Sequence, residues 1–131
     1  MNTDSRFLRL ALKLDAVASG GLGAGTLLLS SQLDQVLGTP VALTVGTGAF
    51  LVVFAAGLWV LASRARISPA AVWFVIVGNL GWVAASVAVA VSDAFALTGL
   101  GVAFVLAQAA AVVVFADLEY LGLRKARPQT V

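Results

Sequence analysis

Residues 41–63 read VALTVGTGAFLVVFAAGLWVLAS, residues 64–68 read RARIS, and residues 69–91 read PAAVWFVIVGNLGWVAASVAVAV. Each apolar run is long enough to cross a hydrocarbon core about 30 Å thick, which takes about 20 helical residues. Ser68 followed by Pro69 is typical of the N-cap and first position of a helix, so RARIS is a tight turn. This stretch therefore predicts a helical hairpin that crosses a membrane twice.

Two further apolar runs flank this hairpin, at residues 8–29 and 94–121. The composition agrees with membrane spans, because 61% of the 131 residues are hydrophobic and only 11% are charged, with a mean hydropathy of +1.05. We expect an all-α integral membrane four-helix bundle that forms one transmembrane domain over residues 1–131. Residues 122–131 would form a tail outside the last helix.

The Lys and Arg residues all lie on one side of the four apolar runs. Three precede residue 14, two lie in the loop at residues 64–68 and three follow residue 123, whereas residues 30–40 contain none. Short loops rich in Lys and Arg stay in the cytoplasm, so we expect four crossings with both termini cytoplasmic. The same residues account for the net charge of +2 and would contact anionic lipid headgroups, so we expect membrane lipid and no nucleic acid as partner.

Several classes of chemistry are excluded by what the sequence lacks. It contains no Cys and no His, which excludes disulfides, thiol chemistry, ordinary haem ligation and His or Cys metal sites within this chain. Its glycines lie inside apolar runs, without the strand that a phosphate-binding loop requires. No Ser, Thr or Lys is placed as an evident activated nucleophile. We expect no catalytic residue, no cofactor and no metal, and a role that is not enzymatic.

Small residues in the first run predict a close helix contact. Gly21 and Gly25 form a GxxxG pair, a spacing that lets two helix backbones approach closely in lipid. We expect this pair to pack against another helix. A conduit lined by glycine is the alternative interpretation.

Two amides are predicted to lie near the middle of the membrane. Asn79 lies 14 residues before Asp93 and Gln108 lies 15 residues after it, which places both at a similar depth. An amide in hydrocarbon needs a partner, and bonds between helices contribute about 0.6 to 2 kcal/mol. We expect Asn79 and Gln108 to bond to each other; the alternative is a polar ligand site that faces a cavity.

Three carboxyl groups lie in or beside the apolar runs, and ionisable groups in such places normally face protein or water. Asp15 is expected to pair with Lys13, with Arg9 or with a basic residue after the fourth run; the alternative is a carboxyl group that binds a proton or a cation. Asp117 and Glu119 lie at the end of the fourth run. We expect them to anchor the helix at the interface, or alternatively to form a cytoplasmic docking surface.

The two halves of the sequence resemble each other. Residues 20–23 read GGLG and residues 78–81 read GNLG, while residues 42–50 and 96–104 share five of nine positions. Because both halves start on the cytoplasmic side, a duplication would give two parallel-repeat helical hairpins related by an axis along the membrane normal. Chance similarity between apolar helices is the alternative.

Residues 9–16 (RLALKLDA), 78–83 (GNLGWV) and 106–124 resemble a group of uncharacterised small four-span bacterial integral membrane proteins. The resemblance covers nearly the whole chain and implies the bacterial inner membrane, without an activity. Small multidrug transporters are similar in size and in a carboxylate of the first helix, but the pattern around Asp15 differs. DoxX-like proteins are similar in architecture alone, and quinone-linked thiol oxidoreductases require paired cysteines.

We therefore expect a structural or accessory membrane component that binds lipid and either itself, as a homo-oligomer, or another membrane subunit. The competing interpretation is a small oligomeric proton-coupled transporter or channel. In it, Asp15 titrates and Asn79 with Gln108 line a site at mid-membrane. Substitution of Asp15 by Asn separates the two, because only a transporter would lose a proton-dependent flux.

Overall fold

The computed structural model describes residues 3–92 and 97–126 and is helical throughout. Its elements in chain order are α1 (Thr3–Leu28), α2 (Ser30–Leu37), α3 (Val41–Ser63), α4 (Pro69–Val91) and α5 (Gly99–Ala126). No strand occurs in these two ranges. The expected all-helical fold class is confirmed.

The helices are suited to a membrane. In the described ranges, α3, α4 and residues Gly99–Lys125 of α5 are each long and apolar enough to cross it. A fourth candidate span is α1 taken together with α2, which are bent by 89° where they meet. The chain thus has three to four helices apolar enough to cross a membrane.

Two helices have boundaries other than those predicted. α1 begins at Thr3 rather than at residue 8, and α5 continues to Ala126, so residues 122–126 are helical and not part of a tail. The extension of α5 follows from a close contact, since a Cβ atom at Gly122 would lie 2.7 Å from Cα of Leu8 in α1. The predicted start of the last helix at residue 94 falls in residues 93–96, which lie outside the described residues; α5 is described from Gly99.

The long connection after α1 forms the short helix α2. Gly38 ends α2 with a φ of 78°, a left-handed conformation that glycine adopts without strain. The buried Leu37 docks on the start of α5, where its carbonyl oxygen accepts the Thr98 N–H at 3.0 Å. A Cβ atom at Gly101 would lie 2.1 Å from that oxygen, so the contact requires glycine. α2 thereby links the first half of the chain to the second.

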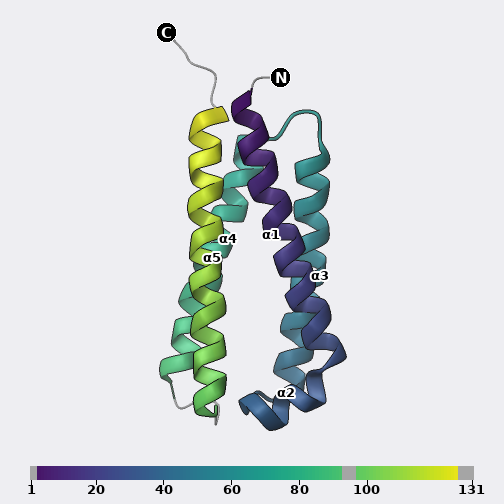
Figure 1. The fold of residues 1–131 in the computed structure, drawn as a ribbon, viewed down its shortest axis with the longest axis vertical. Coiled ribbons are helices and arrows are strands. Elements are labelled where there is room, and N and C mark those ends of the chain that lie inside the picture. The colour runs from purple at the N-terminus through teal and green to yellow at the C-terminus, as the bar shows by residue number, and fades with distance from the viewer. Residues whose placement is uncertain (1–2, 93–96, 127–131) are drawn as a thin grey trace.

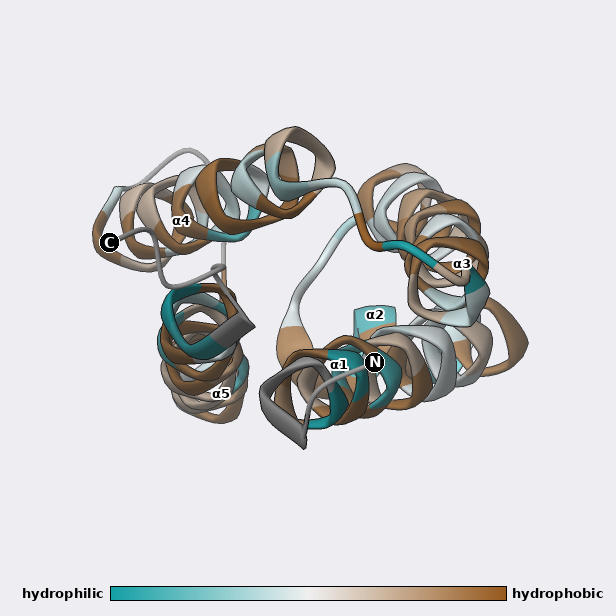
Figure 2. Cartoon of the chain, turned by 90° about the horizontal axis from the view of Figure 1, so that it is seen from above, coloured by the Kyte–Doolittle hydropathy of each residue, from teal (hydrophilic) through white to brown (hydrophobic). Residues whose placement is uncertain are grey.

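The four long helices form an open arc around a common axis (Figure 2). The principal contacts join α1 to α3, α1 to α5, and α4 to α5. The start of α1, the loop at residues 64–68 and the end of α5 lie at one end of the molecule, and α2 lies at the other (Figure 1). We call the first of these the basic end, because it carries the described basic residues, which are Arg6, Arg9, Lys13, Arg64, Arg66, Arg124 and Lys125.

Apolar side chains from four helices close the basic end. Leu12, Ala62 and Val72 are fully buried there. The complete cluster, which we call the basic-end core, consists of Leu8, Leu12, Ala16, Leu58, Ala62, Val72, Val75, Ile76 and Leu123. Toward α2 the interior is less filled, and the cavities described below lie in that part.

The close approach of α1 to α3 uses other glycines than predicted. A Cβ atom at Gly23 would lie 2.8 Å from the Gly48 carbonyl oxygen, and one at Gly48 would lie 3.0 Å from the Gly23 carbonyl oxygen. At Gly21 and Gly25 a Cβ atom would meet nothing within 4 Å. Gly23 is two positions from each of them, which turns it to a different face of the helix. Within the chain, the expected contact of Gly21 and Gly25 is not made; a contact with another copy stays a prediction.

Candidate functional site

An amide between two buried carboxyl groups forms the most polar part of the interior. Asn79 Nδ2 donates to Asp15 Oδ2 and to Glu119 Oε1, each at 2.9 Å. Ser19 Oγ donates to the other Asp15 oxygen, Oδ1, at 2.9 Å. The exposed fractions are 2% for Asp15, 4% for Asn79 and 0% for Glu119. We call these four residues the acid–amide cluster; it joins α1, α4 and α5.

Helix periodicity places each member of the cluster on a buried face. Asp15 follows Leu12 by three residues on α1, and Glu119 lies three residues after Ala116 and four before Leu123 on α5. Residues three and four apart share one side of a helix, so each carboxyl group is carried into the interior by its apolar neighbours. Asn79 lies about 15 Å along α4 from its first residue, at 1.5 Å per residue, and so near the middle of that helix.

The basic side chains near the cluster have other partners. Lys13 Nζ lies 5.4 Å from the ring centroid of Trp59, and Arg9 donates to the carbonyl oxygens of Ala62 and Arg64. Among the described residues, Asp15 forms no ion pair, so the expected pairing with Lys13 or Arg9 is wrong. Lys13 lies two positions before Asp15, which turns its side chain to a different face of α1.

Basic residues on α5 also turn away from the cluster. Lys125 Nζ lies 4.7 Å from the ring centroid of Phe7, and the Arg124 guanidinium lies 5.9 Å from that of Tyr120. α3 and α4 contain no ionisable side chain. No described cation therefore balances the two carboxyl groups.

One carboxyl oxygen of the cluster is left without a partner. Glu119 Oε2 is buried and accepts no hydrogen bond from the described residues. Leaving a buried polar atom unsatisfied costs about 1 to 3 kcal/mol, and more when the group is charged. Such an atom in a native interior calls for an explanation, and a bound proton, water or ion can supply it.

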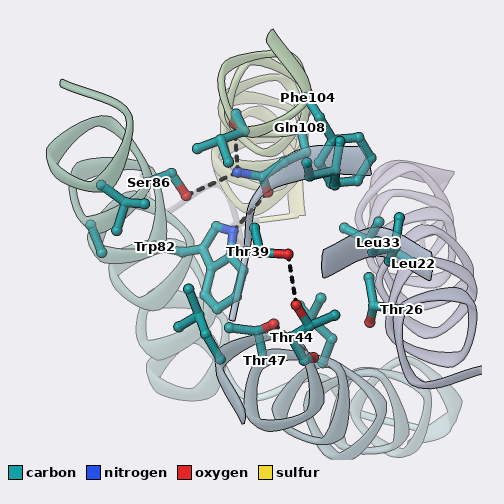
Figure 3. A pocket seen from close by; sticks show the side chains of 16 residues that line it. Leu22, Thr26, Leu33, Thr39, Thr44, Thr47, Trp82, Ser86, Phe104 and Gln108 are labelled. Atoms are coloured by element: carbon teal, nitrogen blue, oxygen red, sulfur yellow. Dashed lines mark hydrogen bonds between the residues drawn. The ribbon is translucent and has the colours of Figure 1, made fainter. Parts of the chain in front are cut away.

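Gln108 belongs to a second polar group, nearer to α2. Trp82 Nε1 donates to Gln108 Oε1 at 2.8 Å, and Gln108 Nε2 donates to Ser86 Oγ at 2.9 Å and to the Val105 carbonyl oxygen at 2.7 Å (Figure 3). The expected bond between Asn79 and Gln108 is therefore wrong. In α5 the residue level with Asn79 is Glu119, which lies eleven residues after Gln108 and thus about 16 Å along the helix.

Asp117 does not join the cluster. Its side chain is exposed on α5, whereas that of Glu119 is fully buried. Two positions along a helix turn a side chain by about 200°, which separates these neighbours. The interfacial anchor expected of both residues is wrong for Glu119 and stays a prediction for Asp117.

Two cavities adjoin the polar groups. The first, which we call the cluster cavity, has a volume of about 360 Å³ and is lined by Ser19 and Asn79 together with aromatic side chains. The second, the α2 cavity, has a volume of about 230 Å³ and is shown in Figure 3. Both are lined by Leu22, Leu51, Trp82 and Gln108, so they are neighbours along one groove.

Stacked aromatic rings bridge the groove between α3 and α4. The centroids of Phe50 and Trp82 are 5.7 Å apart, and those of Phe50 and Phe54 are 5.9 Å apart. Sequence reasoning missed the roles of Trp82 and Ser86. Their spacing from Asn79, at three and seven residues along α4, was the available signal, because it places all three on one face.

Among the described residues, the buried ionisable side chains are the carboxyl groups of Asp15 and Glu119, a type of group that binds and releases protons. In the part of the chain that the structure describes, no group of three or more His, Cys, Asp or Glu residues is placed to hold a metal ion. Comparison with protein-family models, with curated proteins and with solved structures finds no match to this chain.

Proposed function

We propose that this chain is a small proton-coupled membrane transporter, in which the acid–amide cluster binds the proton and the adjoining groove holds the transported molecule. One observation carries the proposal: a single amide, that of Asn79, donates to two buried carboxyl groups, those of Asp15 and Glu119. Ionisable groups inside membrane helices commonly mark proton or substrate pathways.

The lack of a described cation at the cluster supports proton binding. Two negative charges held at one amide in an apolar layer would repel each other, and no described residue supplies a positive charge to balance them. The cluster therefore holds at least one proton. Glu119 Oε2 is the carboxyl oxygen that no described residue uses, and we place the exchangeable proton there.

The position of the cluster connects the proton to the groove. Asn79 and Ser19 hold the carboxyl groups and also line the cluster cavity, so a molecule in that cavity touches the groups that hold the carboxyls. Loss of the proton leaves two negative charges between α1 and α5. Their repulsion opposes the close packing of Gly122 on Leu8 and favours opening of the basic end.

The proposal includes an orientation and a location. We place the basic end in the cytoplasm, because short loops rich in Lys and Arg stay there. The chain then crosses the bacterial inner membrane four times, with α1 and α2 together forming one crossing. Its partners are membrane lipid and the transported molecule.

Flux measurements in proteoliposomes test this function. Vesicles filled with a pH-sensitive dye receive an inside-negative potential from a potassium gradient and valinomycin. We expect proton uptake above that of protein-free vesicles, and loss of that uptake in Asp15→Asn and in Glu119→Gln.

Asp117→Asn is the matched control, because it neutralises an exposed carboxyl group on the same helix as Glu119 and should leave uptake unchanged. Circular dichroism and size-exclusion chromatography show whether each variant is folded. Equal uptake by wild type and folded Asp15→Asn would overturn the proposal.

A structural or accessory role is the second candidate, and the small-residue face of α1 favours it. A Cβ atom added at Gly21 or Gly25 would meet no described atom within 4 Å, which leaves room for a helix of another copy or subunit. A Gly25→Leu variant should then lose self-association, measured by crosslinking in the membrane. Unchanged self-association would argue against this use of the face.

A further inference from the structure

The α2 cavity has an uncharged lining drawn from the whole fold. Its walls come from all four long helices, from α2 and from the loop before α3, and no lining residue is ionisable. The lining residues are Leu22, Thr26, Leu33, Leu37, Thr39, Leu43, Thr44, Thr47, Leu51, Trp82, Ala85, Ser86, Val89, Phe104, Val105 and Gln108. Charged ligands would find no counter-ion here, so this cavity suits a neutral and mostly apolar molecule.

The orientation of the Gln108 amide is determined by its neighbours. An indole N–H only donates, so the oxygen of Gln108 must face Trp82, and the NH₂ group then faces Ser86 (Figure 3). Both amide hydrogens are used, by Ser86 Oγ and by the Val105 carbonyl oxygen. Ser86 Oγ therefore accepts, and its own hydroxyl hydrogen has no acceptor in the described part of the chain.

The remaining hydroxyl groups of the lining are mostly satisfied within the protein. Thr26 Oγ1 donates to the Gly23 carbonyl oxygen at 2.9 Å, and Thr47 Oγ1 donates to that of Thr44 at 3.1 Å. Thr44 Oγ1 lies within hydrogen-bond distance of Thr39 Oγ1, at 2.9 Å, and of the Pro40 carbonyl oxygen, at 3.2 Å, so both threonine hydroxyl groups can use their hydrogens within the protein. Among the described residues, Ser86 on α4 is thus the lining side chain with a hydroxyl hydrogen left to donate.

From these contacts we propose that the α2 cavity binds a neutral, apolar molecule that carries a hydrogen-bond-accepting oxygen, such as the carbonyl of a ketone. The ligand oxygen accepts from the Ser86 hydroxyl group, and its apolar body lies against the leucines and Phe104. Transport of this ligand rests on the proposed function, whereas its binding in the cavity does not. We commit to a free small molecule as the occupant.

Benzophenone is a suitable test ligand, because it is neutral, has one carbonyl oxygen and forms covalent adducts with nearby C–H bonds under ultraviolet light. Diphenylmethane has the same two rings without the oxygen. With the protein in lipid nanodiscs, we expect saturable labelling of residues that line the α2 cavity. Diphenylmethane should compete about 3- to 10-fold more weakly than unlabelled benzophenone, the factor that one hydrogen bond supplies.

Ser86→Ala removes the proposed donor while keeping the size of the side chain nearly unchanged. We expect the affinity for benzophenone to fall by about 3- to 10-fold and the preference over diphenylmethane to disappear. Ser63→Ala is the matched control, because Ser63 is an exposed serine at the basic end. Equal affinity of wild type for the two ligands, or adducts outside the cavity, would contradict the inference.

The source of the carbonyl is tested by changing the lipid. Phospholipids with ester links carry carbonyl groups, whereas their ether analogues do not. Equal benzophenone affinity in nanodiscs of both lipids supports a free ligand. Tighter binding only in ether lipid would assign the cavity to a lipid ester and overturn the free ligand.

Failure of this inference is distinguishable from failure of the proposed function. Asp117→Asn should bind benzophenone as wild type does, because Asp117 is exposed and does not line the α2 cavity. Proton uptake without saturable benzophenone binding would contradict only the ligand that we assign to the α2 cavity. Binding without proton uptake removes only the transport function.

Discussion

At the scale of single residues, the interior is organised by Asn79. Its two amide hydrogens satisfy one oxygen each of Asp15 and Glu119, which come from different helices. A buried amide needs partners, and a buried carboxyl group needs donors. Each of the three residues therefore lowers the free-energy cost of burying the other two. Gln108 is independent of this group, because Trp82 and Ser86 are its side-chain partners.

A double-mutant cycle measures this arrangement. Combining Asp15→Ala with Asn79→Ala should give a coupling free energy of about 1 kcal/mol, since the two share a hydrogen bond between helices. Unfolding of the protein in mixed detergent micelles provides the free energies.

The matched cycle combines Asn79→Ala with Gln108→Ala. Because no hydrogen bond joins these two residues, their effects should add within about 0.5 kcal/mol. A coupling as large as that of Asp15 with Asn79 would mean that the amides meet each other after all.

At the scale of helices, the packing depends on glycines, where one helix backbone approaches its neighbour closely. α1 lies on α3 where Gly23 faces Gly48, and α5 lies on α1 where Gly122 faces Leu8. In lipid there is little hydrophobic gain from joining two helices, so close van der Waals packing supplies much of the association. These contacts hold α1 between α3 and α5 and bring Asp15 to Glu119.

Alanine at Gly23 should separate α1 from α3. The new Cβ atom would lie 2.8 Å from the Gly48 carbonyl oxygen and 2.9 Å from Leu51 Cβ, and overpacking of this kind costs about 1 to 3 kcal/mol. The free energy of unfolding in micelles should fall by that amount.

Gly25→Ala on the same helix is its control. Its Cβ atom would meet nothing within 4 Å, so stability should change little. An equal loss of stability in Gly23→Ala and Gly25→Ala would contradict the packing of the Gly23 face of α1 against α3.

Alanine at Gly101 should release α2 from α5. The added Cβ atom would lie 2.1 Å from the Leu37 carbonyl oxygen, a backbone atom that moves only with its helix. Since Leu37 is buried, a Leu37→Cys reporter should react with maleimide faster once Gly101→Ala is present. Gly99→Ala, where nothing lies within 4 Å, should leave the reaction rate unchanged. Slow reaction in both would show that α2 does not depend on this contact.

The sequence predicts the helices better than it predicts their partners. Apolar length and the Ser68–Pro69 start locate α3 and α4 at their observed bounds, 41–63 and 69–91. Depth counted from Asp93 paired Asn79 with Gln108, because such a count does not say which way each side chain points, and the Asn79 amide donates to Glu119 instead. Partner choice depends on helix offset and rotation, and these arise from the glycine contacts between helices.

At the scale of the whole molecule, charge separates the two ends. The described basic residues lie at one end, and α2, which carries Asp34, lies at the other. Between the ends, the groove passes from the α2 cavity to the cluster cavity and stops at the basic-end core. If the basic end lies in the cytoplasm, as we propose, the groove of this conformation is closed on the cytoplasmic side.

The orientation is open to a direct test, because the natural chain has no cysteine. Gln35→Cys in α2 and Ala65→Cys in the loop at residues 64–68 both replace exposed residues. A membrane-impermeant maleimide added to cells whose outer membrane is permeable to it should label Gln35→Cys. It should label Ala65→Cys only after the inner membrane is opened. The reverse pattern would invert the proposed topology.

Infrared difference spectroscopy of the protein in lipid, followed across a pH titration, detects the proposed proton itself. We expect wild type to show the C=O band of a protonated carboxyl group, and to lose it on titration to alkaline pH. Asp117→Asn should keep this band, whereas the Asp15→Asn/Glu119→Gln double variant should lack it. A band that persists in the folded double variant, or that is absent from wild type at every pH, would contradict a proton held by the carboxyl groups of Asp15 and Glu119.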